Sequence, residues 1–162
     1  MNIERYIEVR RAIPLEKVSF GYQTVMLYPA DELEEAQLGY SVGESGEDLT
    51  GENAGDWKRS WLVIAYEDLQ GEPLFIDQSV PELPVYTAAH GAGAWNPALI
   101  ASSLRGFIEA LEEVEHVSKG RGNPVEAERN PLPDGERQRT LSRIAEVNGN
   151  APLEFWESWL EV

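Results

Sequence analysis

Two apolar stretches joined by a short polar turn restrict the fold more strongly than any other part of this sequence. Residues 60–66 are apolar, β-branched and aromatic, which is typical of a buried strand, and residues 73–77 form a second such stretch after a turn that contains Gly71. We therefore predict a β-hairpin in the middle of the chain. Pro81 and Pro84 indicate that a further strand after this hairpin begins late or lies at a sheet edge. Shorter runs predict strands at residues 17–22, 25–28, 38–42 and 84–87.

Helical spacing of apolar residues predicts helices towards both ends of the chain. The strongest candidate spans residues 97–117, where Asn96 can cap the helix and Pro97 suits its first turn. The last predicted helix, residues 152–161, is too apolar for a free tail, so we expect it to dock on the core. Further helices are predicted at residues 3–13, 29–37 and 136–148. Exposed loops are expected at residues 43–55, 90–97 and 118–135.

Together these elements predict one α+β domain over residues 1–162, with a mostly antiparallel sheet and helices packed against it. The hydrophobic and charged fractions, 42% and 26%, are close to those of globular proteins, so the chain can bury a core of its own. We interpret residues 118–135, which are polar and contain three prolines, as a linker to C-terminal helices at 136–161.

The sequence gives three indications of the compartment. It contains no cysteine, which excludes disulfides, thiolate metal sites and a cysteine nucleophile, and which fits a reducing environment. Its N-terminal residues have no uninterrupted apolar core of the signal-peptide kind. The longest apolar run, residues 61–66, falls far short of the roughly 20 residues that span a bilayer. We therefore expect a cytoplasmic protein.

The chain is strongly acidic, and its charge is unevenly distributed. It has 13 basic and 29 acidic residues, a net charge of −16. Residues 31–56, called the acidic segment below, carry nine acids and no base. Such a surface repels phosphate backbones and anionic lipids and speeds the encounter with a basic partner, so neither nucleic-acid binding nor membrane docking is expected. The same charge can also serve solubility alone.

No motif for catalysis, a cofactor or a metal stands out. His90 and His116 have no neighbouring histidine, whereas metal sites need several ligands at set spacing. Carboxylates four residues apart, such as Glu109 and Glu113, are interpreted as solvated helix faces. The nucleophile elbow, the Walker loop and the dinucleotide fingerprint are missing from the sequence. We therefore predict a protein that is not an enzyme and that uses no cofactor and no metal.

Two sets of residues are candidates for partner binding. Acidic side chains of the acidic segment would attract a basic partner and speed its association. Aromatic side chains beyond that segment would either line a groove for a ligand or partner, or pack as core. The acidic candidates are Asp31, Glu32, Glu35, Glu44, Glu47, Asp48, Glu52 and Asp56. The aromatic candidates are Trp57, Trp61, Tyr86 and Trp95.

The stretch from Trp57 to Leu111 resembles a known family. Its motifs are a tryptophan-led strand, a glycine turn, a strand ending in Ile-Asp, a Pro-Val-Tyr strand and a Ser-Leu-x-x-Phe helix. They read Trp61-Leu62-Val63-Ile64, Gly71-Glu72-Pro73-Leu74-Phe75-Ile76-Asp77, Pro84-Val85-Tyr86, His90-Gly91, Trp95 and Ala101-Ser102-Ser103-Leu104 with Phe107. This order is similar to that of the Smi/Knr family in the SUKH superfamily. The chain departs from the family pattern at Ala65, where a glycine is usual, and in its N-terminus, which lacks the usual Leu-Pro and Asn-Gly pairs.

The resemblance implies a SUKH-like α+β fold and protein binding without catalysis. Many bacterial SUKH proteins are similar to immunity proteins, which neutralise a cognate toxin, often a nuclease. A fungal branch is linked to cell-wall assembly through protein contacts. Because a nuclease needs a basic surface, the acidic segment would complement it, and we expect an immunity protein that binds a basic toxin domain. The alternative is a regulatory or scaffold protein that binds a host protein or small ligand through the aromatic residues. The oligomeric state stays open between monomer and dimer.

Overall fold

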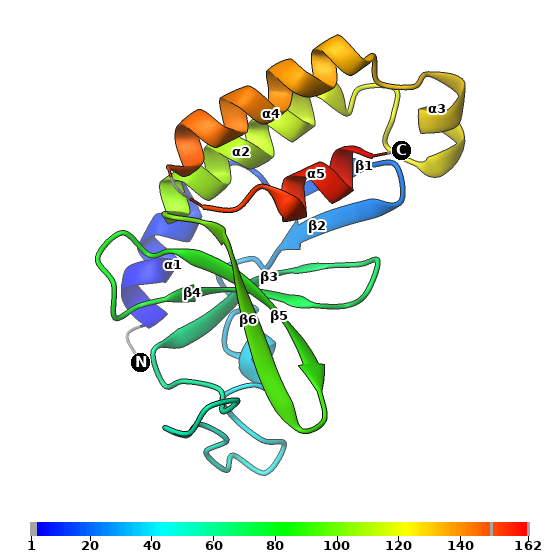
Figure 1. The fold of residues 1–162 in the computed structure, drawn as a ribbon. Coiled ribbons are helices and arrows are strands. Elements are labelled where there is room, and N and C mark those ends of the chain that lie inside the picture. Colours follow the sequence, from blue (N-terminus) through cyan, green and yellow to red (C-terminus); the bar gives the residue numbers. More distant parts are fainter. Residues whose placement is uncertain (1–2, 150, 162) are drawn as a thin grey trace.

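The computed structural model describes residues 3–149 and 151–161, and these residues form an α+β fold in which helices pack against a six-stranded sheet (Figure 1). The strands are β1 (Lys17–Phe20), β2 (Gln23–Leu27), β3 (Trp61–Glu67), β4 (Pro73–Asp77), β5 (Val85–Gly91) and β6 (Ala94–Ala101). The helices are α1 (Ile3–Ala12), the 3-10 helix η1 (Glu35–Gln37), α2 (Leu104–Val117), α3 (Pro124–Arg129), α4 (Asp134–Asn148) and α5 (Glu154–Leu160).

The six strands follow one another across the sheet in sequence order, each antiparallel to the next. Short connections favour this arrangement, because strands that are neighbours in sequence pair most readily. Residues with positive φ close two of the hairpins: Gly21 (58°) joins β1 to β2, and Ala92 (53°) with Gly93 (78°) joins β5 to β6. The predicted α+β class and the predicted central hairpin, formed by β3 and β4, are confirmed.

The central strands contribute side chains to two hydrophobic clusters, one on each face of the sheet. On β3, Leu62 and Ile64 belong to the larger cluster, which the helices complete, whereas Val63 between them belongs to the smaller one. Phe75 on β4 also belongs to the smaller cluster, and its two neighbours belong to the larger. This is the two-residue period of a strand. The helices therefore cover one face and leave the other to the connection between β2 and β3.

The helical layer is fixed by capping and by buried tryptophans. The side chain of Ser103 caps α2 by accepting a hydrogen bond from an amide of its first turn. Trp156 and Trp159 of α5 are both almost fully buried. Their indole groups donate hydrogen bonds to the carbonyl of Ile100 (2.9 Å) and to that of Phe20 (3.3 Å). The predicted docking of the last helix on the core is confirmed.

The predicted helix over residues 97–117 is wrong in its first part. Residues 94–101 form β6, which pairs along its length with β5, and the helix begins only at Leu104. Asn96 and Pro97, predicted as the cap and first turn, therefore lie in a strand. Proline is tolerated there because β6 is at the edge of the sheet. An edge strand has no neighbour on one side, so a residue without an N–H group need not cost a hydrogen bond between strands.

The same hairpin corrects two neighbouring predictions. The loop predicted at residues 90–97 is instead the turn and the facing ends of β5 and β6. The strand predicted at residues 84–87 continues to Gly91 and lies between β4 and β6 rather than at an edge. In both cases pairing with a second strand extends the regular structure beyond what the local pattern indicates.

Three further segments differ in detail. The α-helix predicted at residues 29–37 is a series of turns that ends in the 3-10 helix η1. The strand predicted at residues 38–42 is reduced to an isolated bridge between Leu38 and Val42. The connection predicted at residues 118–135 contains the short helix α3, which Asn123 caps through its side chain.

Candidate functional site

The acidic segment lies at the end of the molecule far from α2 and α4, as the cyan and teal part of the ribbon in Figure 1 shows. It has little regular structure beyond η1, but it is tied together by isolated bridges, including Val42 to Asp48 and Thr50 to Trp57. Tyr40, within it, and Trp57, directly after it, pack on the smaller hydrophobic cluster of the sheet. The acidic segment is therefore an ordered surface element rather than a free loop.

Gln37 anchors the acidic segment to the sheet. Its side chain is buried, and its amide group donates hydrogen bonds to the carbonyls of Leu33 (2.8 Å) and Val63 (2.9 Å). Its Oε1 atom accepts a hydrogen bond from the amide of Val63 (2.9 Å). The register of β2 and β3 ends at Leu27 and Ala65, and one further bond joins the Tyr28 amide to the Ile64 carbonyl (3.0 Å). Beyond this bond, the Gln37 side chain pairs with the backbone of Val63 as a strand residue would.

Three of the predicted acidic residues shape the segment itself. Their carboxylates accept hydrogen bonds from backbone amides two or three residues away: Glu47 from Ser45, Asp48 from Thr50 and Asp56 from Asn53, each at 2.9 Å. The Thr50 hydroxyl and amide, aided by the Arg59 guanidinium 3.2 Å away, lower the pKa of Asp48. These three residues therefore hold turns in addition to carrying charge.

The other five predicted acids are exposed, and within the described part of the chain their carboxylates make no hydrogen bond or ion pair. They are Asp31, Glu32, Glu35, Glu44 and Glu52. An exposed carboxylate without an internal partner keeps its capacity to accept bonds from a basic group of another molecule. Of the eight predicted acids, these five are the ones that the fold leaves available.

The four predicted aromatic residues come together in one aromatic cluster, which also includes Tyr40 and Phe75. Trp57 is at its centre and only 1% exposed, with ring centroids of Trp61, Trp95, Tyr40 and Phe75 between 4.6 and 5.3 Å away. Trp61, Tyr86 and Trp95 are half-buried. Trp57 thus packs as core, while the three others keep an accessible edge.

A groove opens where the acidic segment meets the aromatic cluster. We call it the tyrosine groove; it has a volume of about 570 Å³ and is lined by Tyr28, Glu32, Glu35, Ala36, Leu38 and Tyr40. Burial raises the pKa of Tyr28, and the nearby Tyr40, Tyr66 and Glu32 raise it further. Burial also raises the pKa of Tyr40. Both phenols therefore stay neutral donors at physiological pH, beside the carboxyl groups of Glu32 and Glu35.

No local sequence pattern marks Tyr28, Tyr40 or Gln37 as residues of a site. Tyr28 follows directly on β2, where the pattern predicts only the end of a strand. Tyr40 and Gln37 lie in a stretch without clear periodicity, and their roles depend on contacts with β3 and with Trp57, more than fifteen residues away. A lone glutamine or tyrosine carries no local signal of such contacts.

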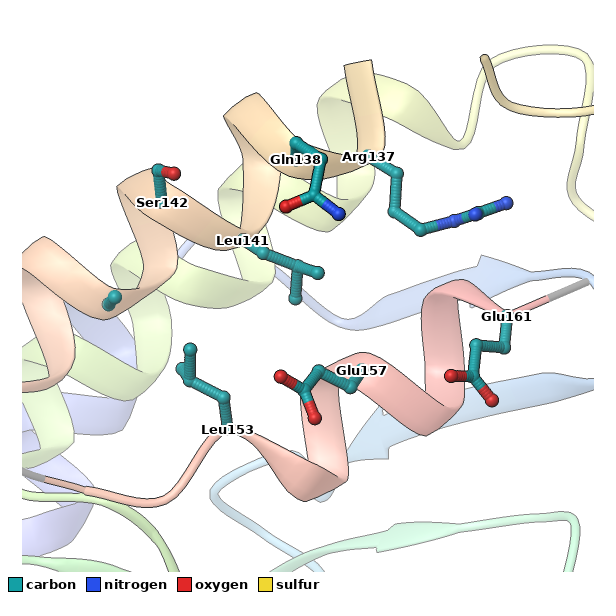
Figure 2. A pocket seen from close by; sticks show the side chains of 8 residues that line it. Arg137, Gln138, Leu141, Ser142, Leu153, Glu157 and Glu161 are labelled. Atoms are coloured by element: carbon teal, nitrogen blue, oxygen red, sulfur yellow. The ribbon is translucent and has the colours of Figure 1, made fainter. Parts of the chain in front are cut away.

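A second hollow, of about 400 Å³, lies between α4 and α5 (Figure 2). Leu141 and Leu153 line it from the two sides, and the Arg137 side chain extends along it. Arg137 donates hydrogen bonds to the carbonyl of Leu160 (3.1 Å) and to Asp134 (2.9 Å). Its guanidinium is thus engaged in joining the two helices, and this hollow is a seam of the helical layer.

Within the described residues, no group of three or more histidines or carboxylates is placed to hold a metal ion, and no helix is long and apolar enough to cross a bilayer. No family model, curated protein or solved structure matches this chain. The chemical character of the site is an acidic rim around aromatic side chains.

Proposed function

We propose that this protein is a binding module, without catalytic activity, whose acidic segment captures a basic protein. The observation that supports the proposal is a set of five exposed carboxylates that have no bonding partner among the described residues. They are carried on a segment that Gln37 and the aromatic cluster hold in place. A pre-formed surface of one charge steers a partner of opposite charge and loses little entropy on binding.

The more specific form of this proposal is an immunity protein that neutralises a basic toxin domain. It is supported by the resemblance of residues 57–111 to the SUKH superfamily and by the complementarity between an acidic surface and a nucleic-acid-binding one. The competing proposal, a regulatory or scaffold protein, places the main contact on the half-buried edges of Trp61, Tyr86 and Trp95 instead. The two differ in the salt dependence of binding, because apolar contacts are not screened by salt.

The test is a pull-down from the source cells and their secreted material at low and at high salt, identified by mass spectrometry. The test variant carries Glu→Lys at 32, 35, 44 and 52, which spares the turn-forming carboxylates of Glu47, Asp48 and Asp56. The matched control carries Glu→Lys at 112, 115, 128 and 146, all exposed positions of the helical layer with the same change in net charge.

We expect a basic protein that the wild-type and the control retain at low salt only, and that the test variant loses. With that partner purified, its association rate should fall about tenfold or more in the test variant. Retention that survives high salt and is equal in both variants would reject the acidic surface and favour the regulatory alternative. An equal loss in both variants would show that net charge, rather than this surface, is responsible.

A further inference from the structure

The walls of the tyrosine groove are aromatic and are supported from behind. The ring centroid of Tyr28 lies 5.3 Å from that of Tyr66 on β3. The ring of Tyr40 lies 5.1 Å from Trp57 and 5.4 Å from Trp95. Because each tyrosine packs against another aromatic ring, the groove exists before a partner arrives, and its occupant need not order it.

The groove is also negatively charged. Glu32 and Glu35, three residues apart, both line it, and its lining includes no basic side chain among the described residues. The Arg10 guanidinium reaches the backbone of Tyr28, but it donates to the carbonyls of Tyr28 (2.8 Å) and Ile13 (3.1 Å) and not to a carboxylate. Among the described residues, no basic side chain forms an ion pair with Glu32 or Glu35.

A cation with a flat, weakly hydrated head fits these walls best. A guanidinium stacks on aromatic faces and at the same time donates hydrogen bonds in its plane to carboxylates. Its methylene stem would lie against Ala36 and Leu38, of which Leu38 is 46% exposed. A lysine ammonium is a compact and strongly hydrated charge, and it would use the carboxylates but gain less from the rings.

We propose that the tyrosine groove receives an arginine side chain of the basic protein captured by the acidic segment. This proposal depends on the proposed function for the identity of the partner, but the groove can be tested without that partner. If the groove does not bind arginine, the proposed capture of a basic protein by the wider acidic surface still stands. If the pull-down recovers no basic protein, binding of arginine in the groove can still be tested.

The experiment is a titration of the ¹⁵N-labelled protein with N-acetyl-arginine amide, followed by amide chemical shifts. The neutral isostere N-acetyl-citrulline amide and N-acetyl-lysine amide are the comparison probes. The variant E32Q/E35Q removes both groove carboxylates without changing their shape. The matched control E44Q/E52Q removes the same charge elsewhere on the acidic segment. Intermolecular NOEs from the arginine δ-methylene protons to tyrosine ring protons report stacking directly.

We expect saturable shifts centred on residues 28–40 with the arginine probe, NOEs to Tyr28 or Tyr40, and weaker binding of lysine. Affinity should fall at least about fivefold in E32Q/E35Q, as expected for two exposed charge-assisted contacts, and stay within about twofold in E44Q/E52Q. Equal shifts with citrulline, tighter binding of lysine, an equal loss in both variants, or no shifts in the groove would overturn the proposal.

Discussion

Tyr6 shows what a single buried polar atom contributes to this protein. The side chain is 1% exposed in the larger hydrophobic cluster, and its hydroxyl has no hydrogen-bond partner among the described residues. Burial raises the pKa of Tyr6 well above its usual value, and the nearby Arg10 opposes this only in part. Burying the neutral phenol is tolerable, whereas burying a phenolate is not.

Tyr6 should therefore make the protein sensitive to alkali. Below pH of about 10 the phenol is neutral in both the folded and the unfolded chain, so it contributes no pH dependence. Above that pH the unfolded chain ionises while the folded chain does not, so stability falls as pH rises, at up to about 1.4 kcal/mol per pH unit. Tyr6→Phe should flatten this fall, and at pH 7 should cost less than about 1 kcal/mol because no hydrogen bond is lost.

Urea unfolding at pH 8, 10 and 11 measures this effect. Tyr22→Phe is the control, because the Tyr22 side chain is 67% exposed. A decline in stability with pH that is as steep in Tyr6→Phe as in the wild-type would contradict the assignment of the alkaline sensitivity to Tyr6. Tyr28, Tyr40 and Tyr86, whose pKa values burial also raises, should contribute to the slope that remains.

At the scale of elements, the acidic segment depends on β3 for its position. Gln37→Leu would remove hydrogen bonds to both the amide and the carbonyl of Val63, a residue that is 1% exposed. Two buried backbone groups without partners should cost about 2–4 kcal/mol of stability in urea unfolding. Amide hydrogen exchange across residues 38–56 should also accelerate more than exchange in α2.

The matched control is Gln70→Leu, in the exposed turn between β3 and β4, which should change stability by no more than about 0.5 kcal/mol. An equal effect of both substitutions would show that the loss comes from replacing glutamine by leucine as such, and not from the bonds to Val63. Unchanged exchange in residues 38–56 would show that the aromatic cluster alone holds the segment.

Elements also show where the sequence misleads. Residues 98–101 are apolar and continue the periodicity of α2, so a helix starting at Pro97 satisfies every local criterion. Pairing with β5 overrides this helical preference, because residues 94–101 form a strand. The helix α2 therefore begins only after Ser103, which caps it. Likewise, β5 extends beyond Thr87 because β6 supplies its partner. Local propensity places a helix or strand well, but its ends depend on the neighbour against which it pairs.

At the scale of the whole molecule, salt should act on the acidic segment in two ways, through stability and through binding. Its nine acids repel one another, which destabilises the compact state, and they attract a basic partner. Salt screens both interactions. Raising NaCl from 10 to 300 mM should therefore raise the melting temperature by about 2–5 °C while it weakens binding.

A variant with Glu→Gln at 32, 35, 44 and 52 should show a smaller rise in melting temperature than one with Glu→Gln at 112, 115, 128 and 146. The second set lies on α2, α3 and α4, which together carry five arginines beside nine acids, whereas the acidic segment carries nine acids and no base, so less repulsion is relieved in the helices. Differential scanning calorimetry at each salt concentration measures the comparison. Equal responses of the two variants would mean that the repulsion is not concentrated in the acidic segment.

The sequence by itself determined the α+β class, the central hairpin of β3 and β4, the helices at both ends and the concentration of acid in residues 31–56. Each of these follows from a pattern that repeats within about twenty residues, and side-chain periodicity reports such patterns directly. The docking of α5 also follows from its own composition, because Trp156 and Trp159 have too much apolar surface to leave in water.

Only the tertiary structure decided which of the acids are free and what lies beside them. Glu47 and Glu44 are equivalent in sequence, yet one holds a turn and the other is unbound. Tyr28 and Tyr40 line one groove because β3, through Val63 and Gln37, sets η1 and the residues after it against the sheet. Such contacts join residues far apart in the chain, and their energies depend on geometry that no local pattern encodes.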